Sequence, residues 1–268
     1  MSAQALEFDD ISVAFPPRER GAKAYMAVGG ATFTVGAGEF VSIVGPTGCG
    51  KSTLLNVAAG LMAPTGGSLR VFGTDLAGLN RQAGYMFQAD ALMPWKNTID
   101  NVILGLRFRG MPETEARELG RFWLNKVGLT HAAERYPHQL SGGMKKRAAL
   151  AQTLIVDPKI VLMDEPFSAL DVQTRQLMEN ELLALWQADR KSVLFITHDL
   201  EEAIALSDRV IVLSAGPATR PIGEYVVNLP RPRDVAEIRL TPDFLGLHEC
   251  IWHAMREEVL KGYAQTNA

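Results

Sequence analysis

A glycine-rich stretch, GPTGCGKS (45–52), has the residue types and spacing of a phosphate-binding loop. It fits G-x-x-x-x-G-K-[ST] at every fixed position, and it lies between an apolar run and a helical pattern. Glycines let backbone N–H groups turn toward an anion at a helix N-terminus. Lys51 would reach the β- and γ-phosphates, and the Ser52 hydroxyl would bind Mg²⁺. We therefore expect a nucleoside triphosphate to contact the whole loop: Gly45, Pro46, Thr47, Gly48, Cys49, Gly50, Lys51, Ser52 and Thr53.

Two carboxylates, Asp164 and Glu165, follow a second apolar run at 160–163. Residues at the carboxyl end of a buried parallel strand lie at the edge of the sheet where ligands bind. Asp164 would hold Mg²⁺ through water, and Glu165 would polarise an attacking water as a general base. The alternative is a pair of acids that caps the next helix.

A second glycine-containing turn, Ser141-Gly142-Gly143, begins a helical pattern within LSGGMKKR (140–147). Its hydroxyl and N–H groups can bind an anion, although a plain helix cap has the same residues. One loop is enough for one nucleotide, so the second loop needs its own explanation. The basic run at 145–147 is interpreted as a solvated helix face and not as a nucleic-acid patch.

The composition is that of an ordinary globular chain of 268 residues, with 47% hydrophobic residues and a net charge of −3. This charge gives no reason to expect nucleic-acid binding. The two cysteines, Cys49 and Cys250, and the five histidines lack the spacing of a disulfide framework or a zinc site. The sequence shows neither a signal peptide nor an apolar run of ~20 residues, so we expect a soluble chain.

Alternating strand and helix patterns predict an α/β fold with a mostly parallel sheet. Helical patterns begin at Lys51 and Glu113, and another runs from 172 to 188. The region from about 90 to 141 is interpreted as a helical insertion. After a proline-rich stretch, Thr241 and Pro242 would begin an amphipathic helix, which we expect to pack on the parent domain. Strands are expected near 6–14, 31–35, 40–44, 68–72, 160–164, 192–196 and 209–214.

Six motifs follow one another in the order GPTGCGKS, Gln88, LSGGMKKR, LMDEP, SALD and THD. This set resembles the ATP-binding subunits of ABC transporters over nearly the whole chain. The resemblance implies a P-loop NTPase of ABC type: an α/β fold with a central, mostly parallel sheet, an N-terminal antiparallel β subdomain and an inserted helical subdomain. The ATPase domain would span 1–228, with the helical subdomain at about 90–141, and 229–268 would form a C-terminal extension with an amphipathic helix.

The resemblance also implies roles for residues outside the first loop. Ser141, Gly142 and Gly143 would contact the γ-phosphate held by a second copy of the chain, with Asp171 at the seam between the copies. His198 would contact the γ-phosphate, and Gln88 would sense Mg²⁺ and the attacking water and relay to membrane subunits. The implied catalytic residues are thus Glu165, His198 and Gln88, and those near the metal are Ser52, Gln88 and Asp164.

Three details of the resemblance are specific to this chain. Phe15 lies on the early strand expected to carry the aromatic residue that stacks on adenine. The insert at 16–23 lengthens the next loop, however, and leaves Tyr25 as a rival. Lys146 replaces the glutamine that is common after the signature, and Gln152 replaces a common arginine.

The residues at 92–95, LMPW, include side chains that are favoured at protein interfaces. They predict docking on a permease. The alternative is that they lie in the core of the helical subdomain. Together with the other motifs they resemble the nitrate, sulfonate and taurine importer group. That group implies ATP and Mg²⁺ as cofactors and a location on the cytoplasmic face of the inner membrane. The implied partners are permease subunits, a second copy and, indirectly, an extracytoplasmic solute-binding protein. Lipid or amino-acid transport, a soluble ABC-type ATPase without a permease, and an ATP-binding regulator are the alternatives.

Overall fold

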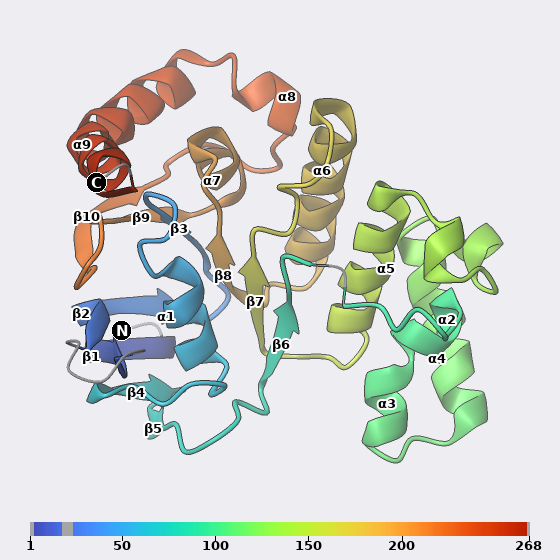
Figure 1. The fold of residues 1–268 in the computed structure, drawn as a ribbon. Coiled ribbons are helices and arrows are strands. Elements are labelled where there is room, and N and C mark those ends of the chain that lie inside the picture. Colours follow the sequence, from blue (N-terminus) through green and yellow to red (C-terminus); the bar gives the residue numbers. More distant parts are fainter. Residues whose placement is uncertain (1–2, 18–23, 90, 267–268) are drawn as a thin grey trace.

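The computed structural model describes residues 3–17, 24–89 and 91–266, which form two β-sheets with helices around them (Figure 1). The smaller sheet is antiparallel, with the order β2 (Tyr25–Gly36), β1 (Gln4–Phe15), β4 (Gly66–Val71) and β5 (Thr74–Asp75). The larger sheet has the order β10 (Pro221–Val226), β9 (Arg209–Leu213), β3 (Phe40–Val44), β8 (Ser192–Ile196), β7 (Ile160–Asp164) and β6 (Ala83–Met86). All of its pairs are parallel except β10 with β9. The predicted α/β fold class is confirmed.

The helices cover the larger sheet on both faces and form a separate group at one side (Figure 1). One face packs on α1 and the small sheet, and the other on α6, α7 and α9. Every residue of β3, β7 and β8 is buried, as expected of parallel strands between two layers. The helices are α1 (Lys51–Ala58), α2 (Thr98–Val102), α3 (Leu104–Phe108), α4 (Glu113–Lys126), α5 (Gly142–Leu154), α6 (Val172–Ala188), α7 (Leu200–Leu206), α8 (Val235–Ile238) and α9 (Pro242–Thr266).

All seven expected strands are present, with ends that shift by a few residues, but β5, β6 and β10 were not expected. The sequence of β6 is AGYM, in which glycine weakens the strand pattern. Glycine suits this position because a Cβ at Gly84 would lie 3.0 Å from the carbonyl oxygen of Thr153 on α5, a tight contact. The strand β10 begins with Pro221, which suits an edge strand.

Helices α2 to α5 share an apolar core of their own. Within it, Asn101 is fully buried and holds the preceding loop: its Oδ1 accepts from the Met93 N–H at 2.7 Å, and its Nδ2 donates to backbone carbonyls. This loop contains the LMPW stretch, whose two ends differ. Leu92 belongs to the core at 7% exposure, whereas the Trp95 side chain is 71% exposed.

The C-terminal segment, 229–266, lies against α6, α7 and the sheet (Figure 1). Arg231 pairs with Asp208 at 2.7 Å, and Arg233 donates to the carbonyl of Ser207 at 2.7 Å. Helix α9 begins where Thr241 and Pro242 predict it, and its buried side chains, Phe244, Ile251 and Met255, join the core beside α7. In the part of the chain that the structure describes, no helix combines the length and apolar character that a membrane crossing requires.

The packing of α9 predicts a large difference between two neighbouring substitutions. Phe244 is 2% exposed in the core, and Leu245 is 57% exposed. We expect Phe244→Ala to lower the free energy of unfolding by about 3–5 kcal/mol, the usual range for a buried phenylalanine. Leu245→Ala should change it by less than about 0.5 kcal/mol. Urea unfolding of the two variants measures the difference, and equal losses would contradict this packing of α9.

Candidate nucleotide-binding site

A hollow of about 510 Å³ opens at the carboxyl edge of the larger sheet. Its walls come from the P-loop, the end of β6 and the loops that follow β7 and β8. These segments are far apart in the sequence, and the parallel sheet places their ends side by side. The lining residues are Thr47, Gly48, Gly50, Lys51, Ser52, Thr53, Gln88, Glu165 and His198.

The P-loop has the backbone that an anion cradle requires. Gly48 and Gly50 have φ of 76° and 110°, in the region that favours glycine. A Cβ at Gly50 would also lie 3.2 Å from the carbonyl oxygen of Ala27. Lys51 is 5% exposed, and its ammonium donates to the carbonyls of Gly45 at 2.9 Å and Pro46 at 3.0 Å. The loop therefore combines glycine conformations that suit an anion cradle with a buried positive charge, as a polyphosphate requires.

Ser52 and Asp164 meet beside the loop, where the Ser52 hydroxyl donates to Oδ1 of Asp164 at 3.0 Å. Burial raises the pKa of Asp164; the hydrogen bond from Ser52 opposes the shift, and the charge of Glu165 adds to it. A buried carboxylate next to a hydroxyl is an oxygen-only donor set, which suits a hard divalent cation such as Mg²⁺. A cation there would also offset the charge repulsion between the two acids. The residues present thus fit the expected metal.

Glu165 is the centre of a three-residue contact. Its Oε2 lies 3.0 Å from Nδ1 of His198 and accepts from Nε2 of Gln88 at 3.3 Å. The Glu165 backbone has φ of 43°, a left-handed conformation that is uncommon outside glycine. Its N–H donates to the carbonyl of Ile196 at 2.9 Å, which fixes the turn to β8. This geometry aims the carboxylate into the hollow.

Other predicted site residues lie outside this hollow. Ser141 caps α5 through a hydrogen bond from the Met144 N–H at 3.3 Å, and the Asp171 side chain caps α6. Gly142 and Gly143 form the first turn of α5, where a Cβ at Gly143 would lie 2.8 Å from Cγ2 of Thr174. The described lining of the hollow includes none of these residues. Their predicted contact with a nucleotide thus requires one held by another copy.

The two candidates for stacking on adenine, Phe15 and Tyr25, are cross-strand partners on β1 and β2. Both side chains are partly exposed, at 37% and 50%. The insert proposed at 16–23 lies mostly outside the described residues, which end at 17 and resume at 24. Both residues stay predictions for the aromatic side chain that stacks on adenine.

Two basic residues form contacts near the site that the sequence analysis did not predict. Lys146 on α5 donates to the backbone carbonyl of Gln88 at 2.7 Å, so the unusual lysine links the signature helix to the Gln88 loop. Arg175 on α6 donates to Oδ2 of Asp199 at 3.1 Å and to the carbonyl of Leu170 at 3.2 Å. The available signal was a basic residue at each helix N-terminus, where the macrodipole disfavours positive charge.

Comparison with known proteins identifies relatives over most of the chain. Residues 28–168 match the sequence profile of the family described as ABC transporter. An uncharacterized ABC transporter ATP-binding protein, MJ0412 of Methanocaldococcus jannaschii, is 46% identical over 83% of this chain and 82% of its own. The taurine import ATP-binding protein TauB of Chromobacterium violaceum is 41% identical over 91% and 93%. The nitrate import ATP-binding protein NrtD of a Synechocystis strain is 42% identical over 82% and 84%.

Solved structures agree with the sequence relatives. The ATP-binding cassette MJ0796, a dimer in a post-hydrolysis state bound to ADP and Pi, superposes with a TM-score of 0.73 at 29% identity. The match covers 84% of this chain and 100% of the cassette. A phosphate-binding loop, an acid pair and a histidine meet at one sheet edge, and the profile extends over the first two of these segments. The chain therefore belongs to the ABC transporter family, and it is an ABC-type ATPase.

Proposed function

We propose that this protein hydrolyses ATP at the described hollow to drive a membrane importer for a small solute of the nitrate, sulfonate or taurine type. The observation that carries the proposal is the contact of Glu165 with both His198 and Gln88 at the mouth of the P-loop hollow. Three chain segments contribute one polar side chain each, and all three side chains line the hollow beside the P-loop.

Each of these residues has a separate role in hydrolysis that follows from its chemistry. Glu165 is placed to accept a proton from the attacking water, and His198 and Gln88 hold its carboxylate in position. The P-loop N–H groups and Lys51 hold the β- and γ-phosphates. Ser52 and Asp164 would hold Mg²⁺, which when bound neutralises charge that develops on the phosphate oxygens. Phosphoryl transfer depends mainly on such positioning and charge stabilisation.

Two copies of the chain would complete each site. Ser141 is exposed at the N-terminus of α5, beyond the hollow of its own chain. A second copy arranged head to tail would bring this turn, with Asp171 at the seam, to the γ-phosphate. MJ0796, 29% identical to this chain, is described as a dimer. ATP would close the pair because the contacts from Ser141 to phosphate form only in the closed state.

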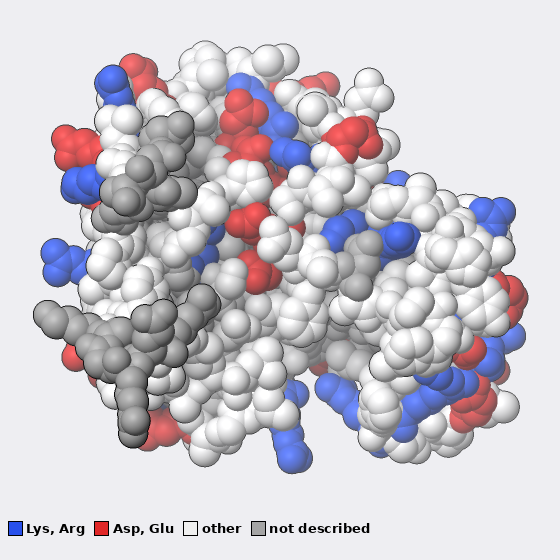
Figure 2. Space-filling model, viewed as in Figure 1, with Lys and Arg blue, Asp and Glu red and all other residues white. Residues whose placement is uncertain are grey.

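A groove of about 700 Å³ between the larger sheet and the helical group is the proposed docking site for a permease. Leu61, Leu79 and Phe87 contribute apolar surface at 44–63% exposure, and Arg81 and Arg109 line the same groove. Figure 2 shows basic side chains on both sides of the notch that separates the helical group from the main body. Apolar and arginine side chains together are typical of interface cores. Docking there would place the protein on the cytoplasmic face of the membrane.

The solute class rests on the relatives. TauB and NrtD are named for taurine and nitrate import, and CmpD of Synechococcus elongatus, 42% identical, for bicarbonate transport. All three names refer to small anionic or zwitterionic solutes. Purification of a tagged chain from membranes in ATP should recover a permease, whose companion solute-binding protein can be screened against these solutes. Recovery of a lipid or amino-acid permease, or of the chain without any permease, would contradict the proposal.

Glu165→Gln tests the general base. We expect ATP binding to persist and turnover to fall roughly 10²–10⁴-fold, because the amide cannot accept the proton from water. Steady-state phosphate release and equilibrium nucleotide binding measure the two effects. Glu115→Gln, an exposed acid on α4, is the matched control and should leave both unchanged. Near-normal turnover by Glu165→Gln would remove Glu165 from this role.

Ser141→Arg tests the contribution of the second copy. The bulky cation should leave ATP binding by the single chain intact and prevent ATP-dependent pairing, because it fills the exposed turn that must approach the partner's phosphate. Light scattering with ATP in the Glu165→Gln background, where the closed state should persist, measures pairing. His138→Arg adds the same side chain three residues earlier and should pair normally. Pairing by the Ser141→Arg variant would refute the role in trans.

Leu79→Asp tests the docking groove. A carboxylate at this exposed apolar position should weaken recovery of the permease at least roughly 10-fold, because docking would bury its charge. ATPase activity of the isolated chain should not change. Leu245→Asp makes the same change at a leucine of similar exposure on α9, 57% against 63%. Equal recovery with both variants would place the permease elsewhere.

A further inference from the structure

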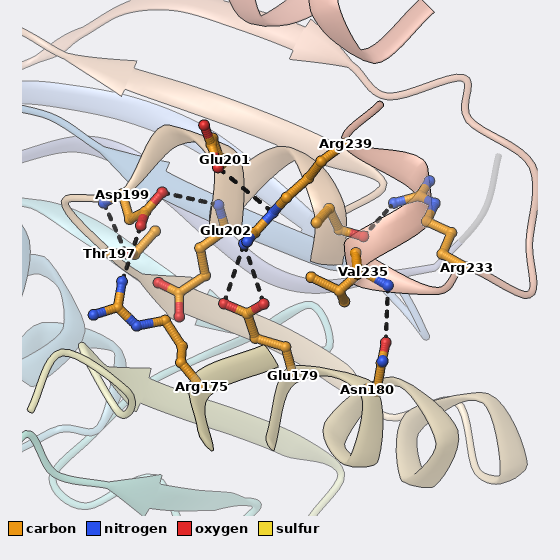
Figure 3. Close-up of polar contacts among 12 residues, drawn as sticks. Arg175, Glu179, Asn180, Thr197, Asp199, Glu201, Glu202, Arg233, Val235 and Arg239 are labelled. Atoms are coloured by element: carbon orange, nitrogen blue, oxygen red, sulfur yellow. Dashed lines mark hydrogen bonds and ion pairs between the residues drawn. The ribbon is translucent and has the colours of Figure 1, made fainter. Parts of the chain in front are cut away.

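A group of charged side chains lies behind the loop that carries His198, at the meeting of α6, α7 and the C-terminal segment (Figure 3). Glu179 on α6 is fully buried, and Glu202 on α7 is 4% exposed. The Nη2 atom of Arg239, which follows α8, lies 3.1 Å from Oε2 and 3.4 Å from Oε1 of Glu179. The C-terminal segment thus supplies the cation for an acid in the interior of the ATPase.

Asp199 connects this group to the nucleotide site, because it is the residue next to His198. Its Oδ1 accepts from the Glu202 N–H at 3.1 Å and so caps α7. Its Oδ2 accepts from Arg175 at 3.1 Å. One oxygen is thus fixed by a helix N-terminus and the other by a guanidinium, which together set the path of the chain through His198.

Arg175 binds Asp199 and also lies near the buried carboxylate of Glu179. Its guanidinium holds Asp199 and the carbonyl of Leu170, and it lies on α6 four residues before Glu179. Residues four apart on a helix face are neighbours. In the described residues, Nε of Arg175 has no hydrogen-bond partner, and Figure 3 shows its side chain close to those of Glu179 and Glu202. A buried carboxylate without a cation is strongly unfavourable, so an unpaired Glu179 would attract this guanidinium.

We propose that Arg239 is a positioning residue for ATP hydrolysis: by pairing with Glu179, it leaves Arg175 to hold Asp199 and thereby the loop of His198. The inference rests on the proposed role of His198 and Glu165. It gives the C-terminal segment a part in turnover although the segment does not line the hollow among the described residues.

The charges that face Glu179 predict how the effect depends on pH. Burial raises the pKa of Glu179 to about 7, and Arg239 and Arg175 oppose the shift. Burial also raises the pKa of Glu202 to about 8. From α5, Arg147 faces α6 but pairs with Glu181. The charged groups that face Glu179 from all sides are Arg175 on α6, Asp199, Glu201 and Glu202 at α7, and Arg239 after α8.

Without Arg239, the pKa of Glu179 would rise further. Below that pKa, Glu179 is neutral and Arg175 stays on Asp199. As the pH increases through it, the new negative charge draws Arg175 away. The loss of activity should therefore develop at alkaline pH and be small under acidic conditions.

Arg239→Met is the principal variant. We expect kcat to fall roughly 10–100-fold relative to the wild type at about pH 8.5 and less than about twofold at about pH 6, the scale of effect for a misplaced catalytic group. The KM for ATP should not change, because the P-loop is unaffected. Arg239→Met/Glu179→Gln should restore kcat at alkaline pH, since a neutral amide does not attract Arg175. Glu201→Gln, which removes the exposed acid beside Arg239, should behave as the wild type.

A second series separates positioning from folding. Arg175→Met should lower kcat at every pH tested, and Glu179→Gln should not restore it. Thermal unfolding checks each variant, and the double variant removes both charges of the Arg239–Glu179 pair, so it tests the proposal even if Arg239→Met is poorly folded. A uniform loss across pH in Arg239→Met without rescue, or wild-type kcat at alkaline pH, would overturn the proposal. Glu165→Gln is measured in parallel, because normal turnover there would instead refute the proposed site.

Discussion

The site depends on the register in which β3, β8 and β7 end at one edge of the sheet. Backbone hydrogen bonds join these ends directly: the Thr197 N–H donates to the carbonyl of Ile43, and the Glu165 N–H donates to that of Ile196. The P-loop begins two residues after Ile43, so phosphate cradle, acid pair and histidine loop come from three adjacent strand ends. A slip in this register would separate Glu165 from His198 and move buried side chains to the opposite face of the sheet.

The sequence was most informative where local pattern and chemistry coincide. Short apolar runs that end in glycine or in Asp164-Glu165 predicted both the strands and the residues at their tips, whereas the run at 192–196 predicted its strand alone and the role of His198 came from the order of the motifs. The contacts that organise these tips could not be predicted, because each joins residues that only the folded sheet and helices bring together. Lys146 reaches Gln88 across 58 positions, and Arg175 reaches Asp199 across 24. A basic residue near each helix N-terminus was a local signal, but it does not identify the partner, which is a backbone carbonyl for Lys146 and a capping acid for Arg175.

The site contains unfavourable features that the surrounding structure must hold in place. Glu165 has a left-handed backbone, which costs on the order of 1–3 kcal/mol when it is not glycine. The turn keeps this conformation through the hydrogen bond to Ile196 and another from the Ser168 hydroxyl to the Glu165 carbonyl at 3.0 Å. Behind it, Glu179 and Glu202 are acids in the interior whose pKa values are raised by burial. Strained backbone and buried charges are typical of functional sites, where the position of a side chain matters more for the reaction than for stability.

The C-terminal segment contacts the molecule at two places next to the nucleotide site, near the histidine loop and near the P-loop. At its start, Arg239 pairs with Glu179 behind the histidine loop. Toward its end, Glu258 accepts from the Ala215 N–H at 2.7 Å, and a Cβ at Gly262 would lie only 3.0 Å from Cβ of Pro46 in the P-loop. The segment thus makes contacts from the interior of α6 to the outer side of the phosphate cradle. Apolar side chains hold α9 on the core beside α7, and these additional contacts fix the C-terminal segment at two places next to the nucleotide site.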